Sequence, residues 1–599
     1  MNPREVPAEF RLKRGSTILN YISRFSATEK AVFGLLVVIA AVAAAAMALG
    51  VNNYFMVEVP AYGGSIREGD VGLPHTINPV LAVTDVDRDL SALIYSGLMK
   101  YQNGRLMPDL AATTSVSADG LTYTFTLRDN LRFQDGSPLS TDDVAFTVQK
   151  IQDAALKSPH RADWQDVSIN VISPTVIAFT LKQPYSPFLA NTTVGIIPKH
   201  IWGPLSDDQF PLSRYNLEPI GSGPFKETGI DRTPSGIPSS YTVSSWNGYY
   251  GDAPYLSSIT FNFYADDEKA LSALENGAID SLPSIAAADA VKLASNGGEP
   301  YTITSSPLPR IFGVFFNQNQ APVLADKNVR AALQMAVDRD AIVSQALDGY
   351  GLPIDGPLPV GMIGELPPQT SATGILPAAA STTASSSIAA ARSLLEKNGW
   401  RLNPATGVYE LPKKGSSAVT PLSFDIYTAD TPDLKQTAAM LKQTWTALGA
   451  DVNIKIFEPA DLYENVIRDR KYDALLFGES IGKDRDLYAF WDSAERTAPG
   501  LNIALYTNAK VDKLLDAIRS TTDGATRQAD YEQFAELIRA DIPAVFLYVP
   551  DFIYAIPKSL HDVSLSSVTV PSDRFDSVTG WYNTTEKVWQ IFSHSVSIH

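Results

Sequence analysis

The chain has 599 residues, 45% hydrophobic and 19% charged, which is too long for one hydrophobic core and predicts several domains. Its acidic excess, 65 Asp and Glu against 48 Lys and Arg, argues against a nucleic-acid-binding surface. Because the sequence contains no cysteine, disulfides, thiolate metal sites, a cysteine nucleophile and a lipid-modified cysteine anchor are all excluded.

The N-terminus has the pattern of a membrane signal anchor. Residues 31–51 are almost wholly apolar, and some twenty helical residues span roughly 30 Å, the thickness of a bilayer core. Basic residues are frequent in the preceding segment, so residues 1–30 are predicted to be a cytoplasmic tail, with the body on the extracytoplasmic face of the cell membrane. The alternative is a cleavable signal, because Ala46-Met47-Ala48 offers small residues for a peptidase and a product beginning near Leu49.

After an expected short stalk at 52–61, residues 107–151 form the most specific block of the chain. Apolar residues alternate with threonines from Leu121 to Leu127, which predicts a strand with one buried face. A second short strand is expected at 131–133, before the Asp135-Gly136 turn. Ser140 and Asp143 then form a capping box for a helix whose Val144, Val148 and Ile151 share one face.

The rest of the chain alternates strands and helices without an internal repeat, which predicts mixed α/β lobes. The expected strands are 176–181, 256–263 and 423–427, and the expected helices are 267–276, 328–347 and 388–398. Residues 366–387 are rich in Pro, Ala, Ser and Thr and are predicted to be a flexible surface loop.

The 107–151 block resembles the signature of the extracytoplasmic solute-binding proteins of family 5, the peptide and nickel receptors of ABC importers. The resemblance continues in order beyond residue 60. The motifs that carry it include Gly63-Gly64-Ser65-Ile66-Arg67, Ile77-Asn78-Pro79, Pro219-Ile220-Gly221-Ser222-Gly223-Pro224-Phe225, Trp246-Asn247-Gly248-Tyr249-Tyr250, Asn328-Val329-Arg330-Ala331-Ala332-Leu333, Val337-Asp338-Arg339, Gly399-Trp400 and Tyr472-Asp473.

This resemblance implies an α/β fold of the periplasmic-binding-protein type, with two hinged lobes, a small inserted lobe and, here, one preceding transmembrane helix. Lobe one would take residues 58–103, 221–311 and 546–599, lobe two 104–220, and lobe three 312–545. The hinge would lie where the chain crosses between lobes one and three, near residues 312 and 546.

The resemblance also implies where the ligand binds. In peptide-binding relatives a segment of lobe three presents its main chain to the peptide, and here that segment is 472–491. An aspartate that usually holds the peptide amino group is replaced by Gly482 or Lys483, so Asp484 could substitute, Lys483 could hold a ligand carboxylate, or these charges could form a solvated loop. The candidate ligand-binding residues are Gly478, Glu479, Ser480, Ile481, Gly482, Lys483, Asp484, Trp491, Trp246, Tyr95 and Tyr548.

The sequence offers no recognisable catalytic site. Its six histidines are scattered, and no two have the spacing of metal ligands, so no metal or cofactor is expected. The glycine-rich segment 221–224 is not followed by the lysine that a phosphate-binding loop requires. Arg330 and Asp338 are interpreted as a structural charge pair.

We therefore predict a monomeric, non-enzymatic receptor that captures peptides or peptide-sized solutes by lobe closure and delivers them to the transmembrane subunits of an ABC permease. Two alternatives stay open. One is a sensor or carrier for a non-peptide ligand such as a nickel chelate, an opine or an oligosaccharide, and the other is an extracytoplasmic hydrolase on the same scaffold.

Overall fold

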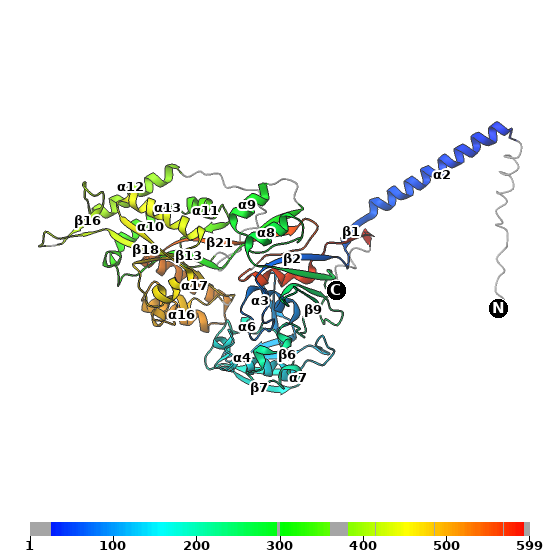
Figure 1. Cartoon of the computed structure of the whole chain (residues 1–599), viewed down its shortest axis with the longest axis horizontal. Coiled ribbons are helices and arrows are strands. Elements are labelled where there is room, and N and C mark those ends of the chain that lie inside the picture. Colours follow the sequence, from blue (N-terminus) through cyan, green and yellow to red (C-terminus); the bar gives the residue numbers. More distant parts are fainter. Residues whose placement is uncertain are drawn as a thin grey trace, which may run out of the picture. The chain divides into compact units, whose positions relative to one another are not determined.

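The computed structural model describes residues 25–295, 300–359, 381–413, 415–483, 485–566 and 568–591. By contacts within the chain it divides into two units, one made of the two terminal segments and the other of Tyr62–Asn583. Figure 1 shows the chain coloured from the N-terminus to the C-terminus.

The first unit contains the apolar helix α2 (Ala27–Phe55), drawn in blue in Figure 1. Ser26 caps it, accepting a hydrogen bond from the main-chain nitrogen of Glu29, and its stretch Ala27–Asn52 is long and apolar enough to cross a membrane. The expected stalk is partly helical and partly strand, because α2 runs directly into β1 (Met56–Pro60), which pairs with β22 (Thr585–Trp589) from the far end of the chain. Residues 585–589, expected in lobe one, thus lie in this strand pair.

The second unit is built on separate sheets of the described residues. One has the order β2 (Ser65–Val71), β11 (Ser258–Tyr264), β10 (Pro238–Ser245) and β9 (Phe225–Arg232). A second has the order β5 (Ala111–Val116), β6 (Thr122–Leu127), β8 (Val176–Thr180) and β7 (Ser168–Ser173). A short hairpin, β3 (Met99–Gln102) and β4 (Arg105–Pro108), precedes the second sheet.

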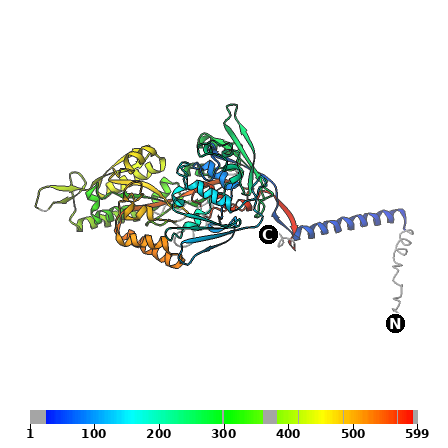
Figure 2. The same cartoon turned by 90° about the horizontal axis from the view of Figure 1, so that it is seen from below.

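The largest sheet runs β12 (Tyr301–Pro307), β21 (Ala544–Pro557), β13 (Arg310–Phe316), β20 (Ala474–Ser480), β18 (Ser423–Ala429) and β19 (Asp451–Phe457), with β14 (Gly351–Pro353) on β21. Strands β15 (Arg401–Leu402), β16 (Tyr409–Pro412) and β17 (Val419–Pro421) form a small sheet at one edge of the unit (Figure 2).

Helices cover these sheets. The longer ones are α3 (Asp85–Ile94), α4 (Thr141–Gln152), α8 (Asp267–Glu275), α9 (Ala287–Ser295), α10 (Lys327–Ala336), α11 (Arg339–Ala346), α12 (Ser381–Lys397), α13 (Pro432–Leu448), α16 (Ala509–Ser520) and α17 (Gly524–Asp541). Shorter turns include α6 (Phe188–Asn191), α7 (Lys199–Trp202), α15 (Tyr488–Trp491) and the 3₁₀ helix η6 (Pro571–Gly580).

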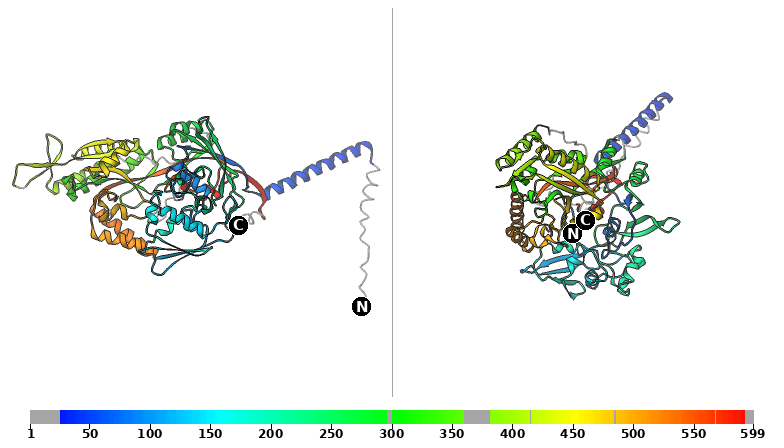
Figure 3. Two further views of the ribbon diagram at one scale, coloured as in Figure 1. Left: turned by 60° about the horizontal axis from the view of Figure 1, so that its bottom comes forward. Right: turned by 60° about the vertical axis from the view of Figure 1, so that its left-hand side comes forward.

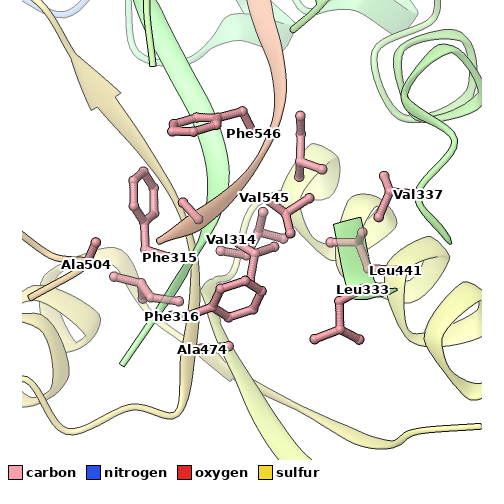
Figure 4. Close-up of a cluster of buried hydrophobic side chains, with 14 of the residues drawn as sticks. Val314, Phe315, Phe316, Leu333, Val337, Leu441, Ala474, Ala504, Val545 and Phe546 are labelled. Atoms are coloured by element: carbon pink, nitrogen blue, oxygen red, sulfur yellow. The ribbon is translucent and has the colours of Figure 1, made fainter. Parts of the chain in front are cut away.

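In the described part of the chain, buried apolar side chains form three clusters, which we name by their residue ranges. The 311–549 core joins β13, β20 and β21 to α10 and α13, as Figure 4 shows for Val314, Leu333 and Leu441. The 66–581 core joins the two four-stranded sheets, α3, α4 and η6. The 270–555 core lies between α8, α9 and β12.

The long strand β21 contributes to all three cores. Its residues 544–549 enter the 311–549 core, while Phe552 and Tyr554 face the 66–581 core and Ile553 and Ala555 face the 270–555 core. This split follows from the period of two of a strand, whose successive side chains point to opposite faces. Figure 3 (left) shows β21 running from the yellow and orange helices toward the green and blue elements.

The local predictions for residues 121–151 are confirmed with one exception. Tyr123, Phe125 and Leu127 are buried along β6, and the capping box of Ser140 and Asp143 begins α4. The expected strand 131–133 was wrong, because only an isolated bridge between Arg132 and Pro138 forms there. The side chain of Asp135 instead holds the turn, accepting hydrogen bonds from the main-chain nitrogen and hydroxyl of Ser137.

The expected helix 328–347 is two helices, and the expected Arg330–Asp338 pair was wrong. Helix α10 ends at Ala336, and the Asp338 carboxylate caps α11 by accepting from the nitrogen of Ala341 at 2.9 Å. Arg330 instead donates to main-chain carbonyls, including that of Ile542 at 2.8 Å. Because Ser381 begins α12, residues 381–387 are helical, while 366–380 of the expected loop lie outside the described residues.

Candidate ligand-binding site

A cavity of about 560 Å³ lies where residues of the 66–581 core meet the segment that follows β20. Such a volume is typical of small-molecule sites. Its walls come from α3, β3, the loop after α6, the turn at Gly482 and Lys483, and η6. Polar and aromatic lining residues are Arg88, Ser91, Tyr95, Ser96, Lys100, Tyr101, Gln102, Asp109, His160, Asp163, Asn191, Thr193, Tyr249, Lys483, Ser572, Asp573, Phe575, Asp576 and Thr579.

The 3₁₀ geometry of η6 places two carboxylates on the cavity wall. With three residues per turn, positions 573 and 576 lie one above the other, so Asp573 and Asp576 face the same side. Arg574, between them in sequence, points into the interior and is fully buried. One oxygen of Asp573 accepts from the main-chain nitrogens of Thr569 and Val570, at 2.7 and 3.0 Å, which fixes this carboxylate.

Lys483 reaches these carboxylates from the other side of the cavity. Its Nζ lies 2.7 Å from Oδ1 of Asp573 and 3.1 Å from Oδ2 of Asp576, and 4.4 Å from the centre of the Tyr101 ring. Burial lowers the pKa of Lys483, but the two carboxylates outweigh burial and raise it, so the ammonium stays charged. Burial raises the pKa of Asp576 to about 7, although Lys483 opposes this.

A second charged pair lies on the same wall. Lys100 Nζ lies 3.2 Å from Oδ1 of Asp109, whose side chain is nearly buried. Burial lowers the pKa of Lys100, but Asp109 outweighs it and the pKa is raised. Tyr95 also lines the cavity, but its hydroxyl is buried without a hydrogen-bond partner among the described residues, and burial raises its pKa, so it stays protonated. A ligand could therefore meet both signs of charge on this wall.

A further contact, outside the cavity lining, joins residue 186, before α6, to residue 519 in α16. The main-chain nitrogen of Ser186 donates to the carbonyl of Arg519 at 2.8 Å. The Arg519 guanidinium in turn lies 2.8 Å from Asp486 and 4.1 Å from the centre of the Tyr488 ring.

The structure brings three of the predicted ligand residues to the cavity wall, namely Tyr95, Gly482 and Lys483. Strand β20 contains Gly478, Glu479 and Ser480, which pair with residues 310–312 of β13, and the Ile481 side chain is buried. Asp484 lies outside the described residues.

Three predicted aromatic wall residues lie elsewhere. Trp491 is fully buried in the 311–549 core against Phe315 and Phe546, because α15 turns it inward. Tyr548 is also in that core, stacked on Phe312 with ring centres 5.1 Å apart. Trp246 is half-buried outside the cavity lining, while its neighbour Tyr249 lines the cavity.

Sequence reasoning missed Lys100, Tyr101, Asp109, Asp573 and Asp576. For the last two a weak signal existed, since an acidic pair three residues apart follows Pro571, a residue favoured at helix starts. No sequence pattern near these residues indicated a contact with Lys483.

The family model described as "Bacterial extracellular solute-binding proteins, family 5 Middle" matches residues 105–498. The chain belongs to this family.

Two named relatives align with this chain over most of their length. Protein XP55 of Streptomyces lividans is 30% identical over 499 residues, which cover 82% of this chain and 84% of the relative. The oligopeptide-binding protein AppA of Bacillus subtilis is 27% identical over 509 residues, covering 84% and 89%.

Solved structures give the same fold. The ABC transporter substrate-binding protein CtaP from Listeria monocytogenes superposes with a TM-score of 0.70 at 27% identity, covering 87% of this chain and 99% of that one. AppA of Bacillus subtilis in complex with a nonapeptide has a TM-score of 0.62 at 25% identity, covering 88% and 99%. The predicted periplasmic-binding-protein fold class is therefore confirmed.

Proposed function

We propose that this chain is the extracytoplasmic substrate-binding subunit of an ABC importer and that it captures peptides or peptide-sized solutes in the 560 Å³ cavity. The observation that carries the proposal is the make-up of this cavity. It combines opposite charges from two sides with aromatic surface, in a chain whose relatives include a protein solved with a nonapeptide.

The edge of β20 supports a peptide as the ligand. Strand β18 pairs with β20 only at Ala474 and Leu475, so beyond these residues that edge has no strand partner in the described part of the chain. The main chain of an extended peptide could form hydrogen bonds with such an edge, whatever the side chains of the peptide. The strand leads directly to Gly482 and Lys483 on the cavity wall.

In this proposal the ligand binds by closure of the two sides of the cavity, and α2 anchors the body outside the cytoplasm. The helix has the length and apolarity of a membrane span, and a cleavable signal sequence has the same features. The mass of the protein from the membrane fraction separates the two, because an anchor keeps the full-length mass and cleavage leaves a product beginning near Leu49.

Native mass spectrometry of the full-length protein in detergent tests the ligand class. We expect a bound peptide-sized solute that is released unchanged on denaturation. Synthetic copies of that solute should raise the melting temperature without being consumed. Turnover of the solute would favour the hydrolase alternative, and a released opine, oligosaccharide or metal chelate would replace the peptide in the proposal.

A further inference from the structure

The ammonium of Lys483 lies in a three-sided site. Two carboxylate oxygens, from Asp573 and Asp576, lie within 2.7 and 3.1 Å, and the face of Tyr101 lies 4.4 Å away. Only 19% of the Lys483 side chain and 9% of the Asp573 side chain are exposed. Two charge-assisted hydrogen bonds and an aromatic face are together a complete set of partners for a primary ammonium group.

The acceptors of this site are held in place without Lys483. Asp573 is fixed by the main-chain nitrogens of Thr569 and Val570, and η6 as a whole is fixed from the inside by Arg574, whose guanidinium binds the buried carboxylate of Glu68 at 2.8 Å. The site is therefore preorganised, so removal of the lysine would leave an acidic pocket in place.

The lysine itself comes from a different part of the chain. Residues 483 and 576 are 93 positions apart, and Lys483 follows β20, whose residues pack in the 311–549 core. The neighbouring Ile481 donates its main-chain nitrogen to the carbonyl of Pro309 at 2.8 Å, so the turn that carries Lys483 is attached to the β12–β13 connection.

We propose that Tyr101, Asp573 and Asp576 form a binding site for a primary ammonium group and that Lys483 is its occupant, in cis, in the ligand-free chain. A free amine must displace Lys483 from a largely buried position, whereas a ligand end without an ammonium leaves this pairing intact. The receptor thus selects ligands whose end at η6 is uncharged or acidic, a consequence that rests on the proposed function.

Chemical rescue tests the site without the natural ligand. The full-length variant Lys483→Met in detergent keeps an unbranched stem of similar length but removes the ammonium group. We expect it to melt below the wild type, and methylammonium chloride to raise its melting temperature in a saturable way. The wild type should not respond, and neither methanol nor sodium chloride at equal concentration should rescue the variant.

The double variant Lys483→Met/Asp573→Asn is the matched control, and it should lose the response to methylammonium. Absence of rescue in Lys483→Met, or an equal response in the wild type, would overturn the proposal while leaving peptide capture untouched.

A second measurement covers the case in which Lys483→Met does not fold. In the wild type, reductive methylation followed by mass spectrometry should modify Lys483 several-fold more slowly than the exposed Lys510. The variant Asp573→Asn should remove most of that protection, and equal rates for both lysines in the wild type would contradict occupancy of the site.

Discussion

Replacement of the buried Arg574 by methionine should be among the most damaging single changes in the chain. Its guanidinium lies 2.5 Å from both Glu68 and Asp89 and 3.9 Å from Asp70, and all four side chains are buried. These contacts join β2, α3 and η6 across almost the whole sequence. Methionine fills a similar volume but leaves three carboxylates without their cation.

The size of the loss follows from the burial of the group. Removal of one partner from a buried ion pair costs about 3–5 kcal/mol, because the remaining charge is neither hydrated nor compensated. Burial already raises the pKa of Asp89 to about 7 against the attraction of Arg574, so loss of the arginine raises it further. The carboxyls can then protonate in the folded state, and the deficit should shrink by at least about 1 kcal/mol between pH 8 and pH 5.

Urea unfolding of the full-length protein in detergent, at pH 8 and pH 5, measures both effects. Arg468→Met is the control, since Arg468 is half-exposed and pairs with Glu464 on the surface, where such pairs contribute about 0–1 kcal/mol. A free energy of unfolding for Arg574→Met within about 1 kcal/mol of the wild type at pH 8 would refute the reasoning. So would an equal deficit at both pH values.

Three further changes test local arguments. The Glu479 carboxyl is buried with no hydrogen-bond partner among the described residues, and burial raises its pKa. Because ionisation of this carboxyl destabilises the wild type at pH 8, Glu479→Gln should raise the urea midpoint there and leave it unchanged near pH 4. Gly221→Ala would place a Cβ 2.0 Å from the carbonyl oxygen of Ile94 and should cost about 1–3 kcal/mol, whereas Gly229→Ala meets open space and should be nearly neutral. Ser140→Ala should lower the stability by about 1 kcal/mol in the same assay, through loss of the α4 cap, and a change below about 0.3 kcal/mol would contradict that cap.

The sequence predicted those parts of the fold that local physics determines. Strand β6 and helix α4 follow from alternation and capping within thirty or so residues, and both are present. The prediction of a single helix at 328–347 was wrong because Asp338 caps the start of a second helix. The prediction used only the spacing of apolar residues, which does not take N-cap residues into account. Boundaries of the three expected lobes stay predictions.

The site was less predictable because its partners meet only in the folded chain. Lys483 was singled out by the family resemblance, near the position where peptide-binding relatives usually have an aspartate, but nothing near it in sequence indicates η6 as its partner. Trp491 and Tyr548 were expected on the cavity wall because they are large aromatic residues in or near the segments expected to bind the ligand. Both are instead buried in the 311–549 core, which suits large apolar side chains equally well. Residue type therefore identified the segment but not the direction of each side chain.

The hinge expected near residues 312 and 546 stays a prediction, and the strand pairing offers two candidate positions beside it. Strand β21 pairs with β12 through residues 551–557 and with β13 through 544–548, so the chain changes partners at Leu308–Pro309 and Val549–Pro550. Both crossings contain a proline, which has no N–H for a strand ladder, and one hydrogen bond, from Leu308 to the carbonyl of Pro550, joins them at 2.9 Å.

Rotation at these crossings would also strain the pairing of β14 with residues 548–550 of β21, and it would carry Lys483 with it through the bond from Ile481 to Pro309. We therefore expect the amide hydrogens of Leu308 and Ile481 to exchange with solvent faster than those of the β12–β21 ladder. A ligand that closes the cavity should slow both together, because the same motion exposes them. Residue-resolved hydrogen exchange with and without the co-purified solute measures this, and protection at both amides equal to that of the ladder in the ligand-free protein would place the hinge elsewhere.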